Sequence, residues 1–205
     1  MVMPAEVVPG QTPIPTLGGD LRLPIAVLPL AAHDGGADQA DLAASITEMA
    51  IALNRNATNA YDMLGVCKLL TGAIGDVIPL EERAIRLDPL DSFAGAYYQR
   101  IGIVELFQSH IGQARSLFEK ARTAYATRQN EWGIQADSWL AAADALNGET
   151  SRAADALAEA RKSSEYPASI VQYRRQAAWH SNPTVQAWAD ATYFKGLRLA
   201  GFPEE

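Results

Sequence analysis

The stretch that decides the fold is 59–89, NAYDMLGVCKLLTGAIGDVIPLEERAIRLDP. Its apolar residues recur at the three- and four-residue intervals of a helix, both before and after Gly72. A glycine at this point supplies the left-handed conformation that ends a helix. Asp88-Pro89 closes the second segment, because proline cannot continue a helix and restricts the residue before it. The stretch therefore predicts a helix, a turn and a second, antiparallel helix.

The same pattern recurs twice further along the chain. Leu64-Gly65 aligns with Ile101-Gly102 and with Leu140-Ala141, at spacings of 37 and then 39 residues. Small residues at equivalent places let two antiparallel helices approach closely, and large residues fill the remaining space. The three copies place Gly72, Ser109 and Gly148 at the turn, Val77, Ala114 and Ala153 at one small place, Glu81, Phe118 and Leu157 at a large place, and Ala84, Ala121 and Ala160 at another small place. Three helix–turn–helix units are predicted.

These residues resemble the tetratricopeptide repeat. The resemblance implies an all-α fold, a superhelix of antiparallel helix pairs, here with a short extended N-terminal tail. The first copy departs from the family at Val77 and Glu81, where alanine and an aromatic residue are usual. Glu81 therefore either points outward or leaves its packing place to another residue. The second copy lacks the turn glycine.

Composition divides the chain into three regions. Residues 1–36 hold six of the eleven prolines and are predicted to be a tail or linker, with 25–28 as the candidate for one short strand. Residues 37–163 are assigned to the repeats, as a half-unit at 39–54 and units at about 58–91, 92–127 and 131–163. Residues 164–205 are assigned to C-terminal capping helices, because a repeat array needs a cap over its last apolar face.

The C-terminal region is rich in aromatic residues. Its last helix is predicted to begin at Ser181-Asn182-Pro183, with proline in the first turn, and to end at Gly201. The aromatics are expected to form the core of the cap, and an aromatic cage for a ligand is the alternative. They are Tyr166, Tyr173, Trp179, Trp188, Tyr193, Phe194 and Phe202.

Charge and composition exclude several classes of function. The 205 residues carry a net charge of −7, which argues against a surface for nucleic acid or anionic membranes. The longest apolar run, LPIAVLPLAA, is about half as long as a membrane span, and prolines interrupt the N-terminus where a signal peptide would be continuous. We expect a soluble, cytoplasmic protein that binds neither nucleic acid nor membrane. The oligomeric state is not predicted.

No arrangement of residues points to an enzyme. The sequence contains no phosphate-binding loop, dinucleotide-binding glycine pattern, zinc-protease helix or nucleophile elbow. The single cysteine, Cys67, is predicted to be a buried apolar residue rather than a nucleophile. Asp76, Glu81 and Glu82 are predicted to form a solvated face rather than a metal site. We therefore assign no catalytic, cofactor-binding or metal-binding residues, and expect no cofactor.

What remains is a binding surface. The first helices of stacked pairs line the concave side of such an array. Most residues that the register places there are apolar, so this predicted concave face is expected to bind a protein or peptide partner, or to hold the chain's own residues 23–30 at rest. It consists of Asp62, Val66, Leu69, Gln99, Ile103, Leu106, Ser138, Ala142 and Ala145.

Three charges occupy a place where the family usually has tyrosine. They are Lys68, Glu105 and Asp144. Stacked helices would let Lys68 pair with Glu105 and would make Glu105 repel Asp144. We favour the simpler reading, three solvated charges on an exposed ridge, each contributing less than about 1 kcal/mol.

A narrower resemblance covers most of residues 40–205. The segments LPIAVLPL (23–30), AIRLDP (84–89), FEKAR (118–122) and ATYFKGLRLAGFPEE (191–205) resemble bacterial class III adenylate/guanylate cyclases that carry C-terminal tetratricopeptide arrays. The cyclase domain is missing here, so no catalytic residue carries over. The resemblance implies a non-catalytic interaction module, regulatory or scaffolding, in cyclase-like bacterial signalling. The alternatives are a cyclase-related remnant with enzymatic activity and a folded fragment without a role.

Overall fold

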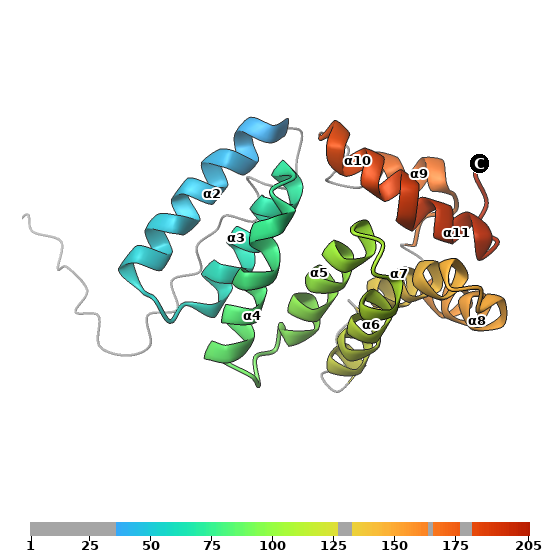
Figure 1. Ribbon diagram of the computed structural model, residues 1–205, viewed down its shortest axis with the longest axis horizontal. Helices are drawn as coiled ribbons and strands as arrows, with labels where there is room; N and C mark the ends of the chain where they lie inside the picture. Colours follow the sequence, from blue (N-terminus) through green and yellow to red (C-terminus); the bar gives the residue numbers. More distant parts are fainter. Residues whose placement is uncertain (1–35, 127–132, 164–165, 177–181) are drawn as a thin grey trace, which may run out of the picture.

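The computed structural model describes residues 36–126, 133–163, 166–176 and 182–205, and the regular elements in these ranges are all helices (Figure 1). The all-α expectation is therefore confirmed for this part of the chain. The predicted tail, with its candidate strand at 25–28, lies outside the described residues apart from Gly36. In chain order the elements are α2 (Gly36–Leu53), α3 (Thr58–Thr71), the 3₁₀ turn η1 (Ile74–Asp76), α4 (Val77–Leu87), α5 (Ala94–Phe107), α6 (Ile111–Ala126), α7 (Gly133–Leu146), α8 (Thr150–Ala160), α9 (Ile170–Gln176), α10 (Pro183–Ala189), the π-helical turn η3 (Asp190–Phe194) and α11 (Lys195–Leu199).

The turns after α3, α5 and α7 share one backbone conformation. Gly72, Ser109 and Gly148 adopt φ angles of 83°, 64° and 82°, in the left-handed region. Ser109 is the one described non-glycine residue with a positive φ. The second turn thus keeps the left-handed conformation without the glycine, although a side chain makes that conformation costly.

Helix α4 ends at Leu87, just before Asp88-Pro89, as predicted, and aspartates build the turn that follows. The Asp88 carboxylate accepts a hydrogen bond from the Leu90 backbone N–H at 3.0 Å. Asp91 then links two helices, because its Oδ2 accepts hydrogen bonds from the hydroxyls of Thr58 and Tyr97, each at 3.0 Å. The start of α3 is thereby fixed beside α5.

Successive helices pack as neighbours, with small residues at the closest approaches. A Cβ on Gly102 of α5 would lie 2.6 Å from the Phe118 ring of α6. A Cβ on Gly65 of α3 would likewise lie 2.3 Å from the Glu81 carboxylate of α4. The other small places are fully buried: Val77, Ala84, Ala114, Ala121, Ala153 and Ala160.

The C-terminal helix forms where the sequence predicts it. Asn182 caps α10, since its side chain accepts hydrogen bonds from the backbone N–H groups of Thr184 and Val185 at 3.0 and 3.2 Å. Helix then continues through η3 and α11 and ends before Gly201, whose φ is 88°. Figure 1 shows this C-terminal helix, residues 183–199, running across the ends of earlier helices.

One side of the C-terminal helix is fully buried. Val185, Ala189, Tyr193 and Leu197 have no exposed surface and recur every four residues. In a straight α-helix, residues four apart would turn about 40° further with each step. The wider turn of η3 offsets this drift. Four side chains therefore stay on one face.

Candidate functional site

The predicted concave face lies mostly inside the molecule. Eight of its nine residues are buried, and the ninth, Val66, is half-buried. Leu69 of α3, Ile103 and Leu106 of α5 and Ala142 of α7 belong to the main hydrophobic core. The structure therefore brings the apolar members from three helices together, as core rather than as open surface.

The C-terminal helix closes this face along α7. The Tyr193 hydroxyl donates a hydrogen bond to the Ser138 hydroxyl at 2.9 Å, within the core. A Cβ on Gly196 would meet the backbone of Ala142, at 2.8 Å from its Cα atom. Glycine at 196 therefore lets α11 touch the backbone of α7. A larger residue at 196 would overlap the main chain of Ala142, which cannot move aside as a flexible side chain could.

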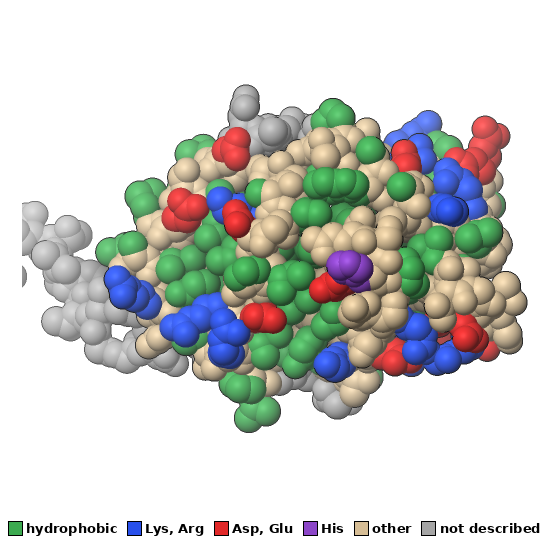
Figure 2. Space-filling view, viewed as in Figure 1, with side chains coloured by type: hydrophobic (Ala, Val, Ile, Leu, Met, Phe, Trp, Pro, Cys, Tyr) green, Lys and Arg blue, Asp and Glu red, His purple; other side chains and the backbone are tan. Residues whose placement is uncertain are grey.

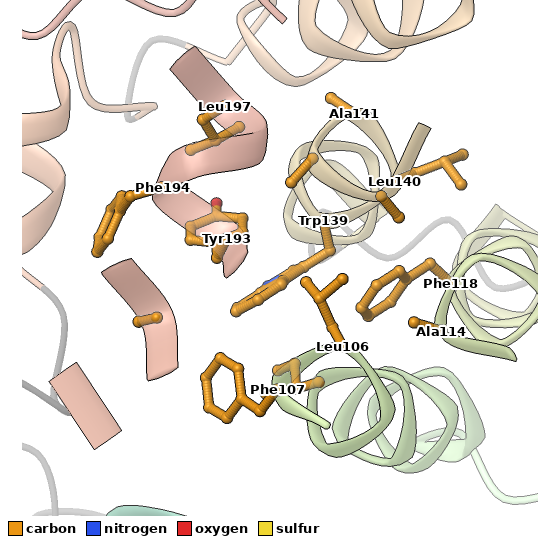
Figure 3. Packing of buried hydrophobic residues seen from close by; sticks show 14 of the residues in the cluster. Leu106, Phe107, Ala114, Phe118, Trp139, Leu140, Ala141, Tyr193, Phe194 and Leu197 are labelled. Atoms are coloured by element: carbon orange, nitrogen blue, oxygen red, sulfur yellow. The ribbon is translucent and has the colours of Figure 1, made fainter. Parts of the chain in front are cut away.

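Aromatic rings fill the space beneath the same helix. Trp139 of α7 stacks on Tyr193 with ring centroids 3.8 Å apart, and on Phe118 of α6 at 5.8 Å. Phe107 of α5 approaches the edge of Trp139 at 6.3 Å. Figure 3 shows Trp139 lying between Tyr193 on one side and Leu106 and Phe118 on the other. Of the aromatics expected in the core of the cap, Tyr193, Phe194 and Phe202 are buried in this core, and Tyr166, Tyr173 and Trp188 pack against it half-buried. Trp179 lies outside the described residues.

At its other end the C-terminal helix reaches α3. The nearest neighbours of Gly72, at the end of α3, include the side chains of Asn182 and Val185. Trp188 lies 6.1 Å from the Phe107 ring of α5. The helix therefore contacts α3, α5 and α7, the three helices to which the predicted concave face was assigned. Residues 23–30, the other candidate to fill this face, lie outside the described residues.

A buried charged cluster lies at the α3 end of this face. Arg100 of α5 donates from Nε to Glu81 Oε1 of α4 at 2.8 Å and forms an ion pair with Asp62 of α3. Glu81 is 0% exposed, so the expectation that it belongs to a solvated face is wrong. Asp76 and Glu82 are exposed. The cation explains how a carboxylate is held at a place where an aromatic is usual.

Burial perturbs both partners of this contact. It raises the pKa of the Glu81 carboxyl well above its ordinary value. Burial lowers the pKa of Arg100 to about 10, which still leaves the guanidinium charged at neutral pH. Glu81 Oε2 has no hydrogen-bond partner among the described residues. The cluster therefore links α3, α4 and α5, and its contribution to stability depends on the positive charge of Arg100.

Each of the three charges expected on one ridge has a partner outside that set. Lys68 pairs with Glu48 at 3.4 Å. Glu105 contacts His110 at 2.7 Å, and Asp144 accepts from Arg115 at 2.5 Å. Asp144 is buried, so the solvated-ridge prediction is wrong for it. Lys68 therefore pairs with α2 and Asp144 with α6, whereas the partner of Glu105 lies in the turn after its own helix.

Among the described residues, the single cysteine is buried and no cluster of metal ligands forms. These residues contain no group of three or more His, Cys, Asp and Glu residues that could hold a metal ion. Cys67 is buried, as predicted, and burial raises the pKa of its thiol, which disfavours the nucleophilic thiolate. None of the described helices combines the length and apolar character needed to cross a membrane.

Comparison with known proteins adds no identification. No protein-family model matches the chain, and no curated protein matches it. Functional inference therefore rests on the residues and their geometry.

Sequence reasoning missed Arg100 and Gly196 as organising residues, and it placed Tyr193 in the core of the cap without its hydrogen bond to Ser138. A signal for Arg100 was present, because an acidic residue at an aromatic place calls for a nearby cation, and Arg100 follows Gln99 of the predicted concave face. Gly196 was signalled only by being a glycine inside a predicted helix. Nothing in the repeat period indicates where the C-terminal helix docks.

Proposed function

We propose that this chain is a non-catalytic, helical-repeat interaction module of the tetratricopeptide type. The observation that carries the proposal is the left-handed turn at Gly72, Ser109 and Gly148, at the spacings of 37 and 39 residues that the repeat register requires. Conservation of the backbone conformation at Ser109, where the glycine itself is lost, supports a repeated structural unit rather than three unrelated turns.

The close approaches within helix pairs support the same proposal. Gly65 faces Glu81 and Gly102 faces Phe118, and in both pairs the second residue lies sixteen positions after the first. A chance pair of helices would have no reason to repeat the small-against-large contact at one offset.

Within this proposal the C-terminal helix takes the place of a ligand. Array proteins of this kind bind helices or extended segments along the side lined by their first helices. Here residues 183–199 contact α3, α5 and α7 on that side. A partner would then displace this helix or bind elsewhere on the surface. The regulatory or scaffolding role in cyclase-like bacterial signalling rests on the sequence resemblance.

Two experiments separate this function from an enzymatic one. Purified chain incubated with ATP or GTP and Mn²⁺ is expected to produce no cyclic nucleotide. Immobilised chain is expected to retain a protein partner that Val66→Glu, on the half-buried member of the predicted concave face, loses and that Leu90→Glu keeps. Cyclic nucleotide formation, or capture identical for all three proteins, would contradict the proposal.

A further inference from the structure

Helix α2 has one face that packs on the chain and one that does not. Ala43, Ala44 and Thr47 are buried against α3 and its neighbours. Leu42, Met49 and Leu53 are instead 54%, 60% and 89% exposed. Ile46 is half-buried, because it also packs against the cluster of Ala43, Ala44, Leu64 and Cys67. Together with Ile46, the three exposed residues form a row at spacings of four, three and four residues, which we call the α2 seam. This spacing places all four on one helix face and is that of a helix–helix contact.

The seam differs from other exposed apolar residues of the described chain. Leu90 and Phe93 lie in the turn between α4 and α5, and Leu199 lies at the end of α11, so none of them extends a helical row. A row of exposed apolar side chains along most of one helix indicates a surface that is covered in use. Figure 2 shows hydrophobic side chains along the edge of the molecule formed by α2.

Opposite charges lie at the two ends of the seam. Exposed Asp41 precedes it, and exposed Arg55 follows it. A second cation lies near Arg55, because the Tyr61 hydroxyl donates to the Arg55 carbonyl at 3.2 Å and the Arg83 guanidinium lies 6.0 Å above the Tyr61 ring. Lys and Arg side chains gather at this end of α2 in Figure 2. A helix lying antiparallel to α2, with the same charges in reverse order, would meet opposite charges at both ends.

We propose that the α2 seam binds the α2 seam of a second copy, as an antiparallel, two-fold symmetric pair of helices. The symmetry places Leu42 against Leu53 of the other copy and Ile46 against Met49. It also places Asp41 beside Arg55 twice. The seam is only about 17 Å long. A single helix face of this length buries much less area than a standard interface, which takes about 800 Å² from each partner. The dimer is therefore weak and depends on protein concentration. This inference goes beyond the interaction function proposed above and does not require it.

Sedimentation equilibrium of the full chain, over about two decades of concentration, tests the proposal. The weight-average mass is expected to rise from 22.1 kDa toward twice that value. Leu53→Glu and Met49→Glu are expected to raise the dimer dissociation constant at least about tenfold, because each change places two charges in the seam of one dimer. Leu90→Glu is the matched control, since Leu90 is 82% exposed away from the seam, and is expected to change nothing. Circular dichroism of each variant verifies that it is folded.

Charge reversal tests the antiparallel arrangement. Asp41→Arg and Arg55→Glu are each expected to weaken the dimer about three- to tenfold at low salt, through repulsion at both ends. The double variant is expected to recover the affinity, since it restores opposite charges across the seam. Both effects should shrink as salt is raised.

Three outcomes would overturn the proposal. The first is a full chain that stays monomeric at every concentration. The second is a dimer that Leu90→Glu weakens as much as Leu53→Glu does. The third is a double charge variant no tighter than its parents, because the antiparallel pairing of Asp41 with Arg55 requires that recovery.

Discussion

The helix pairs α3–α4 and α5–α6 place different chemistry in the same geometry. In α5–α6, Gly102 leaves room for the Phe118 ring. In α3–α4, Gly65 leaves room for the Glu81 carboxylate at the same sequence offset. The ring stacks on Trp139 of α7, whereas the carboxylate accepts from Arg100 of α5. Register thus sets how closely the helices approach. The filling group can be apolar or charged, provided that the next helix supplies its partner.

This difference changes how each pair is tied to its neighbour. An aromatic contact with α7 is lost gradually when atoms are removed, because each atom contributes a small dispersion and transfer energy. A buried charge is different, since removing its partner leaves an uncompensated ion in a nonpolar interior. The α3–α4 pair should therefore be the more sensitive of the two to loss of a single group on α5.

The largest effect is expected from Arg100→Leu. Loss of the guanidinium leaves Asp62 and Glu81 buried without a cation, so the free energy of unfolding should fall by about 3–5 kcal/mol. Urea denaturation at neutral pH measures this change. Arg86→Leu is the control, because Arg86 forms an exposed ion pair with Glu82. This substitution should lower the free energy of unfolding by no more than about 0.5 kcal/mol. Equal losses in the two variants would mean that the buried cluster contributes nothing special.

Gly102→Ala sharpens the register argument with the next largest effect. The new Cβ would overlap the Phe118 ring, and the unfolding free energy should fall by about 1–3 kcal/mol. Phe118→Leu in the same chain should recover part of the loss, giving a coupling energy of at least about 1 kcal/mol. The identical change at Gly112 of α6 meets no atom within 4 Å and should be neutral or stabilising. Additive losses at 102 and 118 would argue against their contact.

The pH dependence of stability probes the charged pair. Burial raises the folded-state pKa of Glu81 above its ordinary value of 4.5, so the folded state holds this proton more tightly than the unfolded state does. That contribution is complete below pH 4.5 and is lost as the pH rises through the folded-state pKa. Relative to Glu81→Gln, the wild-type melting temperature should therefore fall across this window. A difference that stays constant with pH would contradict the assigned shift.

Ser109→Gly should give the smallest change, and a favourable one. Serine at a φ of 64° carries the steric cost of the left-handed region, which glycine lacks, so a gain of about 0.5–1 kcal/mol is expected. Gly148→Ala is the converse test at the equivalent turn, where a Cβ would meet no atom within 4 Å. It should lose about 1 kcal/mol by backbone strain alone. Thermal melts of both variants show whether each substitution stabilises or destabilises the protein.

Much of the local structure could be predicted from the sequence. The helical spacing of apolar residues, together with glycine and proline positions, located the turns at Gly72 and Asp88 and the start of the last helix at Asn182. These signals act within a few residues, so they can be read from the sequence alone. The burial of Glu81 and Asp144 was not predicted, since each depends on an arginine from a different helix, 19 and 29 residues away. The covering of the predicted concave face could not be predicted for the same reason, because it too depends on a contact between residues far apart in the sequence. Residues such as Ile103 and Ala142 were placed on one face by the register, but the helix that covers them begins at residue 183, outside the repeat period.

Amide hydrogen exchange of the full chain tests most directly whether residues 183–199 cover the predicted concave face. With Val185, Ala189, Tyr193 and Leu197 fully buried, the amides of this helix should be protected as strongly as those of α5 and α7. Rapid exchange throughout 183–199, with α5 and α7 still protected, would mean that the face is open and would contradict the account.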